Sequence, residues 1–527
     1  MTPRTSHSFG RWLGAILCLL AGAAACTPEP ESEPERSAPV LAPVALDAIA
    51  LIEARLADAR ATALPSSTPP IPPAELVRRM EGLMGFATGS GGRARDAGVT
   101  DLVDSPAEAS AWLRARALDE DAREAERYLC LEVLERRGGQ DDAEALMAIA
   151  ERARPAGLRA GAYWRLGRMG EDAVLARLTL RLKYETDWEA VLWLGWALCQ
   201  HGIYSGLDGV LAVANSAPDR DLAERATAEA QALADEIGAG DAYQLANGWW
   251  RGELPAGAVP RVRSLEYQLE LWRWIARFDE FQLRGVDDAR FLLARLDGVA
   301  ADVLGAALFD ASPYVRLGAV QCLERMGPRA HSAGPLLLEH LDDPELGPWV
   351  ASALGRIQYT PAKEALEQRL QPGTAPALEV AAARALGHLG LAEAVPALLA
   401  ALKNVDAGQR PELHQAIAES LVWCGAPAFA LEALVAALTD PRLEPSTSSA
   451  ALRHHLARQA AASVPGAQDV LTEFDALKAQ RPPAAAPGSA APTRGGAAPR
   501  EIEAARAALL RNYFDSANPL DSAPVTK

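Results

Sequence analysis

The sequence predicts an all-α protein in which pairs of helices stack into a solenoid. Three observations support this prediction. The sequence is self-similar at a period of 32 residues, apolar residues within a period recur at helical spacing, and a glycine follows many periodic segments. A lone pair of helices cannot bury its apolar face, so such pairs must stack on one another.

Leucines mark the same position in successive periods. We call them anchor leucines; they are Leu134, Leu166, Leu198, Leu354 and Leu386, with looser copies at Leu323 and Leu421. Leu386 is followed by Leu398 and Leu402, which lie 12 and 16 positions further on, and these offsets recur in other periods. We expect the anchor leucines and the apolar residues at these offsets to form the core.

Each period is interpreted as two helices joined by short turns. Val395, Leu398 and Leu402 have the spacing of one helix face. Turns rich in Asp and Pro, such as 310–313, 342–344 and 217–219, precede the second helix, where proline suits the first turn. A glycine ends the second helix, because it readily adopts the left-handed conformation that closes the last turn. These glycines are Gly138, Gly170, Gly202, Gly327, Gly390 and Gly425.

These motifs resemble HEAT repeats, and more closely the bacterial HEAT-like repeats named after phycobilisome lyases. The clearest copies are residues 386–399 and 310–316. The resemblance spans residues 105–476 and implies a right-handed α-solenoid of stacked hairpins. It also implies the Asp–Arg pair of such repeats at Asp310 and Arg316, whereas the unit at Asp343 has Trp349 near the Arg position. Scaffolds, adaptors and some lyases share the repeat, so it implies little about function.

Length and charge exclude several classes of protein. With 527 residues the chain is too long for one compact core, and its 49% hydrophobic content is that of a globular protein. The formal net charge of −17 makes a general nucleic-acid binder a poor candidate, because such proteins need a basic face.

The N-terminus resembles a bacterial lipoprotein signal. Arg4 and Arg11 precede an apolar stretch that is too short to cross a bilayer comfortably, and small residues lead to Cys26. The resemblance implies removal of residues 1–25 and attachment of lipid to Cys26, although Ala23 stands where the family prefers Leu. The alternative is an ordinary secretory signal that is cut after Ala25. Residues 26–73 then form a Pro/Glu-rich tether with one short helix.

The remaining organisation follows from composition. A helix and a Gly-rich linker occupy residues 74–104, and the repeats extend over 105–476 with an irregular stretch at 239–300. Helices near 44–59 and 74–82 are expected to cover the apolar end of the array. A Pro/Ala/Gly linker follows at 477–500, then a C-terminal helix at 501–514 and a tail at 515–527.

No motif indicates a metal, a cofactor or a catalytic centre. Cys130, Cys199, Cys322 and Cys424 are widely spaced, so we expect buried small hydrophobic residues on helices rather than zinc ligands. The acidic residues at 339–345 suit an exposed turn better than a calcium loop. Adjacent histidines at 454–455 point to different sides of a helix, and the Gly-rich 85–93 lacks the ending of a phosphate-binding loop.

Tryptophans are the best candidates for binding a partner, because exposed Trp supplies a large contact area. The candidates are Trp188, Trp196, Trp249, Trp250, Trp272 and Trp274. The alternative interpretation is core packing between imperfect repeats. Trp193 and Trp196 lie three residues apart beside Leu198 and Cys199, which suits a core stripe.

The sequence therefore predicts a lipid-anchored scaffold that binds another protein in the bacterial cell envelope, with the outer membrane or its periplasmic face favoured. We expect no enzyme activity, no cofactor and no nucleic-acid partner. Two alternatives remain open. One is an enzyme, or enzyme subunit, with its site in the irregular region 239–300; the other is a structural spacer of the envelope.

Overall fold

A computed structural model describes residues 44–62, 75–76, 78–80, 99–100, 102–103, 108–255, 257–258, 263–279, 283–439 and 449–480. Over these residues the secondary structure is α-helix and short 3-10 helix, without a strand. The chain divides into two compact units, unit 1 up to Val303 and unit 2 from Leu304, which are described separately. The predictions for Cys26, for residues 85–93 and for everything beyond residue 480 lie outside the described residues.

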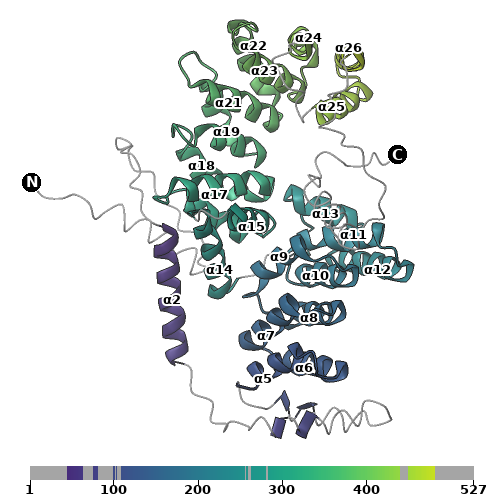
Figure 1. The fold of residues 1–527 in the computed structure, drawn as a ribbon. Coiled ribbons are helices and arrows are strands. Elements are labelled where there is room, and N and C mark those ends of the chain that lie inside the picture. Colours follow the sequence, from purple (N-terminus) through teal and green to yellow (C-terminus); the bar gives the residue numbers. More distant parts are fainter. Residues whose placement is uncertain are drawn as a thin grey trace, which may run out of the picture. The chain divides into compact units, whose positions relative to one another are not determined.

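Unit 1 consists of helices in the order of the sequence (Figure 1). They are α2 (Val44–Thr62), α5 (Glu108–Leu118), α6 (Glu124–Arg137), α7 (Gln140–Arg152), α8 (Ala156–Met169), α9 (Leu175–Tyr184), α10 (Trp188–Gln200), α11 (Leu207–Ser216), α12 (Arg220–Ile237), α13 (Ala242–Arg251), α14 (Leu265–Ala276), α15 (Leu283–Leu293) and α16 (Gly298–Ala307), which runs into unit 2.

In unit 2, 3-10 turns lead into several of the helices. The helices are α17 (Pro313–Met326), α18 (Gly334–Glu339), α19 (Gly347–Arg356), α20 (Lys363–Gln368), α21 (Pro376–Leu389), α22 (Val395–Asn404), α23 (Pro411–Trp423), α24 (Leu431–Thr439), α25 (Ser449–Ala461) and α26 (Ala467–Gln480).

The second helices of successive periods stack on one another, as the repeat predicts. In unit 1, α6 packs on α8 and α8 on α10; in unit 2, α17, α19, α21, α23 and α25 follow in the same way. The prediction of an all-α solenoid of helical pairs is thereby confirmed within the described residues.

The anchor leucines form the centre of this packing. All seven are buried, with no more than 1% of any of them exposed. The partners at the +12 position, such as Leu146, Leu178 and Leu398, are fully buried as well. Burying a Leu side chain stabilises a fold by about 1.5–3 kcal/mol, so the periodic leucines account for the core that the sequence predicts.

Glycines end the second helices as expected. Each of the six predicted glycines has a positive φ, between 61° and 81°. Pro313 begins α17 after the N-cap Ser312, and Asp219 caps α12 through its side chain. The turn at 342–344 differs, because α19 begins only at Gly347 and carries its proline at position 348.

Glycines also let neighbouring second helices approach closely. Gly355 and Gly387 follow their anchor leucines directly, as Gly167 does in unit 1. A Cβ atom on Gly355 would lie 2.6 Å from the Cα of Ala385, and one on Gly387 would lie 2.9 Å from the Cα of Ser420. Such distances leave no room for a side chain, so close packing of α19, α21 and α23 requires these glycines.

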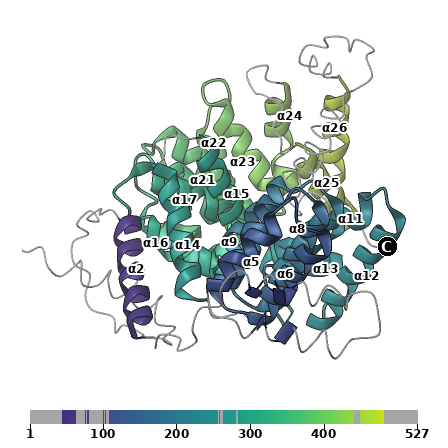
Figure 2. The same cartoon turned by 60° about the horizontal axis from the view of Figure 1, so that its bottom comes forward.

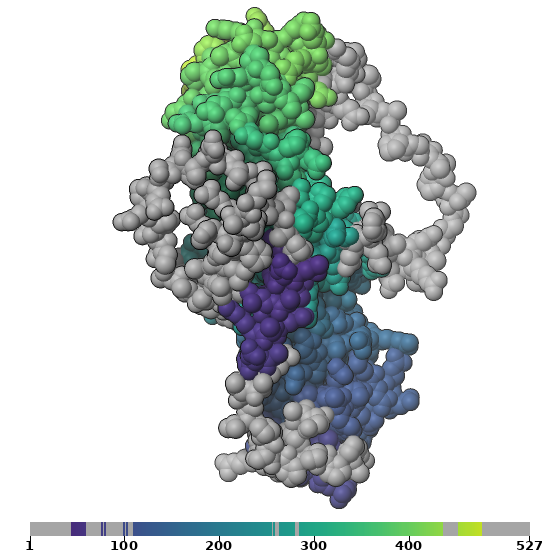
Figure 3. All heavy atoms as spheres, turned by 90° about the vertical axis from the view of Figure 1, so that its left-hand side faces the viewer, coloured from purple at the N-terminus to yellow at the C-terminus, as the bar shows by residue number. Residues whose placement is uncertain are grey.

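Helix α2 does not cover the first repeat, contrary to our expectation. Instead it packs on α14, beside which it lies in both ribbon views (Figures 1 and 2), and Glu53 of α2 pairs with Arg273 of α14 at 3.1 Å. Its buried residues Ala45, Ala48, Ile52 and Leu56 form one face. The opposite face of α2 is exposed, and α2 forms part of the surface in Figure 3. The helix itself was predicted, but its partner lies some two hundred residues away and leaves no local signal.

The four cysteines at 130, 199, 322 and 424 are free and buried on or beside the second helices, as expected. Burial raises the pKa of Cys130 and of Cys424 to about 12, so these thiols stay protonated. Of the described helices, none is both long enough and apolar enough to cross a bilayer.

Candidate protein-interaction surface

The six candidate tryptophans fall into two groups. Trp249, Trp272 and Trp274 are buried, with 4%, 3% and 6% of their surfaces exposed. The other three, Trp188, Trp196 and Trp250, are partly buried and pack against a core cluster formed by α10–α13. Of the six candidates, only these three have side-chain surface that a partner could contact. Their role in binding stays a prediction.

The irregular region 239–300 is held against the preceding repeats by polar contacts. Arg263 donates to a carboxylate oxygen of Asp297 at 2.6 Å and to the backbone oxygen of His201 at 2.9 Å. The hydroxyl of Tyr267 donates to Asp297 at 3.1 Å. Burial would lower the pKa of Arg263, but the charge of Asp297 raises it above its ordinary value.

A second set of contacts joins α15 to α9. Lys183 donates to Asp288 at 2.9 Å, and the hydroxyl of Tyr184 donates to the same carboxylate. Asp172 likewise accepts from the backbone N–H of Ser264, at 2.9 Å. The acids and bases of this region therefore pair with one another across helices, which gives them a role in joining the irregular region to its neighbours.

A different group of residues is arranged as a surface on α6, α8 and α10. We call it the aromatic–arginine surface; it consists of Tyr128, Trp164, Arg165, Arg168, Trp193 and Trp196. Arg168 is exposed and the other five residues are partly buried, and within each helix the spacing is that of one helix face.

Contacts between helices bring these side chains to the same side. Tyr128 of α6 lies over Gly157 and Gly161 of α8, since a Cβ atom on either glycine would meet its ring. Trp196 of α10 lies over Gly167 of α8 in the same way. The rings of Trp193 and Trp196 meet edge to face, with centroids 5.8 Å apart.

Two arginines flank the central tryptophan of this surface. The guanidinium carbons of Arg168 and Arg165 lie 4.5 Å and 5.4 Å from the ring centre of Trp164. Both arginines also pair with Glu135 of α6, at 3.0 Å and 3.4 Å. Burial lowers the pKa of Arg165, and its guanidinium also donates to the backbone oxygen of Gly161 at 3.0 Å. The arginines are therefore held in fixed positions beside the aromatic rings.

Sequence reasoning missed Trp164, Tyr128 and the two arginines, because it sought tryptophans that cluster along the chain. The repeat itself contained the signal. Trp164 and Trp196 are 32 residues apart, and each precedes its anchor leucine by two positions. Residues at one repeat position of stacked helices are neighbours in space, so the two tryptophans had to share a face.

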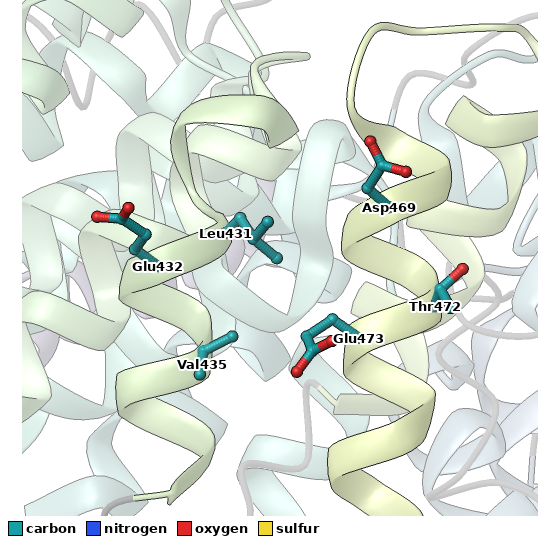
Figure 4. Close-up of a pocket in the computed structure, with 6 residues that line it drawn as sticks. All are labelled: Leu431, Glu432, Val435, Asp469, Thr472 and Glu473. Atoms are coloured by element: carbon teal, nitrogen blue, oxygen red, sulfur yellow. The ribbon is translucent and has the colours of Figure 1, made fainter.

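The structure also contains a cleft in unit 2, between α24 and α26 (Figure 4). It has a volume of about 580 Å³, with Leu431 and Val435 on one side and Asp469, Thr472 and Glu473 on the other. No three His, Cys, Asp or Glu side chains are grouped as metal ligands in the described part of the chain.

The turn residues that the sequence singled out have structural partners. Asp342 pairs with Arg369, and Asp343 accepts hydrogen bonds from the backbone N–H groups of Glu345 and Leu346. At the Asp–Arg position, Arg316 donates to the backbone oxygen of Asp310 at 3.0 Å. These side chains therefore shape the turns between helices.

Comparison with known proteins identifies one repeat by sequence. The family model of the PBS lyase HEAT-like repeat matches residues 379–404, which cover most of α21 and all of α22. This segment is a HEAT-like repeat, and the surrounding helical pairs continue it. A search of curated proteins gives no match.

Solved structures that match this chain include human deoxyhypusine hydroxylase, Kap121p and importin beta. Human deoxyhypusine hydroxylase in complex with glycerol is 18% identical over 60% of this chain and 96% of its own, with a TM-score of 0.21. Kap121p is 10% identical over 77% of this chain and 56% of its own, with a TM-score of 0.24. Importin beta is 13% identical over 69% of this chain and 54% of its own, with a TM-score of 0.24.

The chain thus spans little more than half the length of the last two structures. All three TM-scores are low, and none of these likenesses bears on ligands or partners.

Proposed function

We propose that this all-α repeat protein, with its HEAT-like repeat at residues 379–404, is a scaffold that binds a protein partner through the aromatic–arginine surface. One observation supports the proposal most: Trp, Tyr and Arg side chains are gathered on three stacked helices and held there by contacts between the helices. These residue types contribute most to binding at protein interfaces. Because the side chains are already ordered, little conformational entropy is lost on binding.

The proposal includes attachment to the bacterial cell envelope by lipid on Cys26, with the outer membrane or its periplasmic face favoured. The sequence of residues 1–26 supports this part. A lipid anchor would restrict the scaffold to the membrane surface, where a partner in the same compartment meets it at a high effective concentration.

The experiment is site-specific photo-crosslinking in cells. A photoreactive amino acid replaces Arg168, whose side chain is 52% exposed, and mass spectrometry identifies any crosslinked protein. We expect one discrete adduct, and we expect Trp164→Ala to abolish it. The matched control is Phe429→Ala, which removes an aromatic ring that is 62% exposed in unit 2 and should leave the adduct intact.

Two further arms make the result decisive. Circular dichroism and thermal unfolding show whether Trp164→Ala retains the fold, and Arg168→Glu tests the surface without removing an aromatic ring. A Cys26→Ala version tests the anchor separately. A diffuse ladder of abundant envelope proteins, unchanged by Trp164→Ala, would refute the scaffold and leave the spacer as the better account.

A further inference from the structure

Unit 2 carries three arginines that pair with no acid among the described residues, in a chain with a formal net charge of −17. We call them the arginine patch: Arg325 of α17, Arg356 of α19 and Arg384 of α21. Within the described residues, none of the three makes an ion pair or a hydrogen bond through its side chain. Other arginines of unit 2 do pair, as Arg369 with Asp342 and Arg453 with Asp475.

Repeat position brings the arginine patch to one face of the stacked helices. Arg325 and Arg356 each follow their anchor leucine by two positions, and His388 of α21 follows Leu386 in the same way. Arg384 lies one helical turn before His388. Since α17, α19 and α21 pack in succession, these equivalent positions are neighbours (Figure 1).

Arg356 and Arg384 are both near enough to His388 for their charges to act on its imidazole. Burial, together with the charges of Arg356 and Arg384, lowers the pKa of His388 to about 3. The imidazole is therefore neutral at physiological pH, and no carboxylate is among the groups that shift it. Glu324 of α17, which directly precedes Arg325, accepts a hydrogen bond from Ser352 of α19 at 2.6 Å.

An apolar side chain borders the arginine patch. Trp349 precedes Arg356 by seven residues, so the two share one face of α19, and Trp349 is 44% exposed. Guanidinium groups bind carboxylates through two parallel hydrogen bonds, which a lysine cannot match. Three cations are too few to follow a nucleic-acid backbone, for which affinity depends on the number of neutralised phosphates.

From these observations we infer that the arginine patch binds a carboxylate-rich peptide segment of a partner protein. The segment's acidic side chains pair with the arginines, and an apolar residue beside them contacts Trp349. This surface lies in unit 2 and is independent of the aromatic–arginine surface of unit 1, so either can fail without the other.

The test uses the purified full chain in detergent and two fluorescein-labelled peptides, one with six glutamates and a phenylalanine, the other with lysines in place of the glutamates. Fluorescence anisotropy at low salt should show saturable binding of the glutamate peptide alone. Arg356→Gln combined with Arg384→Gln should weaken this binding by about tenfold or more, because the variant loses the charge-assisted hydrogen bonds of two guanidinium groups.

The control variant carries Arg220→Gln and Arg453→Gln, which change the net charge equally but remove arginines that are already paired with acids. Its affinity should stay within about twofold of the original chain, a difference of less than 1 kcal/mol. Arg356→Lys with Arg384→Lys should restore part of the binding. Absence of saturable binding, equal affinity in the Gln variant, or tighter binding of a single-stranded oligonucleotide would each overturn the inference.

Discussion

Single glycines decide how closely the second helices stack. Glycine usually weakens a helix by roughly 0.5–1 kcal/mol relative to alanine, so its use in a helix interior needs a compensating gain. At Gly355 and Gly387 the gain is contact between backbones, because Ala385 and Ser420 occupy the space where a Cβ atom would lie. Packing, not helix propensity, sets the residue type at this repeat position.

Gly387→Ala is therefore expected to destabilise the protein, although alanine favours helices. The new Cβ atom would lie 2.5 Å from the Oγ and 2.9 Å from the Cα of Ser420, so α21 and α23 must move apart. Overpacking of this kind costs about 1–3 kcal/mol, which urea unfolding can measure. Gly298→Ala is the control, since nothing lies within 4 Å of its Cβ position. Equal stability of the two variants would show that the helices separate freely.

At the scale of residues, the sequence predicted the core better than the surface. The anchor leucines and the capping glycines were predictable because burial and positive φ restrict the residue types that fit. Surface positions carry no such restriction. Trp249 and Trp272 could not be distinguished from Trp164 by residue type, because tryptophan suits both a core and an interface.

Among the elements, α2 shows that a local sequence pattern can predict a helix but not the helix on which it packs. The sequence predicted a helix near 44–59, and the structure has one at Val44–Thr62. Its partner α14 belongs to the irregular region, whose sequence departs from the repeat. The departure at 265–276 now has a physical reason: α14 packs against α2 as well as against α9 and α15 of the array.

Ile52→Ala should release α2 from α14. Ile52 is fully buried, and truncating such a side chain to alanine typically lowers stability by about 2–5 kcal/mol. A loss of this size is large for the contact of a single helix. Hydrogen exchange measured by mass spectrometry should then quicken in α14. Leu46→Ala on the same helix alters a side chain that is 63% exposed and should leave exchange unchanged. If α14 keeps its protection in Ile52→Ala, the contact with α2 is not what orders it.

For the molecule as a whole, the two units differ in their response to acid. His340, His388, His414 and His455 all lie in unit 2, and burial is the first cause of a lowered pKa in each. In unit 1 the pKa values of Glu126 and Glu185 are lowered by hydrogen bonds and charges from arginines, against the effect of burial. Histidines and carboxylates with lowered pKa values lose stability in different ranges of pH.

Acidification should therefore weaken unit 2 first. In the folded protein the pKa is about 3 for His388 and about 4 for His455. Below about pH 6.5 these histidines therefore bind protons in the unfolded state but not in the folded state, which lowers the free energy of unfolding. The carboxylates of unit 1 keep their contribution until the pH falls below about 4.5. Hydrogen exchange at pH 7 and pH 5.5, corrected for intrinsic rates, should show faster opening in unit 2 only. The combination of His388→Gln and His455→Gln should reduce the difference; an equal response of both units would contradict the assignment.

The fold of the repeats was predictable because many weak signals recur in each period and all indicate the same structure. Helical spacing, caps and offsets agree over successive periods, from Leu134 to Leu421. The candidate surfaces were not predictable from composition, since Trp164 and Arg168, or Arg356 and Arg384, become neighbours only when the helices are stacked. Once the period is known, however, residues at the same repeat position can be compared directly, and this comparison pairs Trp164 with Trp196 and Arg325 with Arg356.

The close glycine contacts also limit how such a chain can evolve or be rebuilt. A period with glycine after its anchor leucine fits only a following period that presents a small residue, as Ala197, Ala385 and Ser420 do. Duplicating, deleting or reordering periods would bring unmatched pairs together. The order of the periods is thus constrained at these three contacts, and a rearranged array would need its small residues moved along with its glycines.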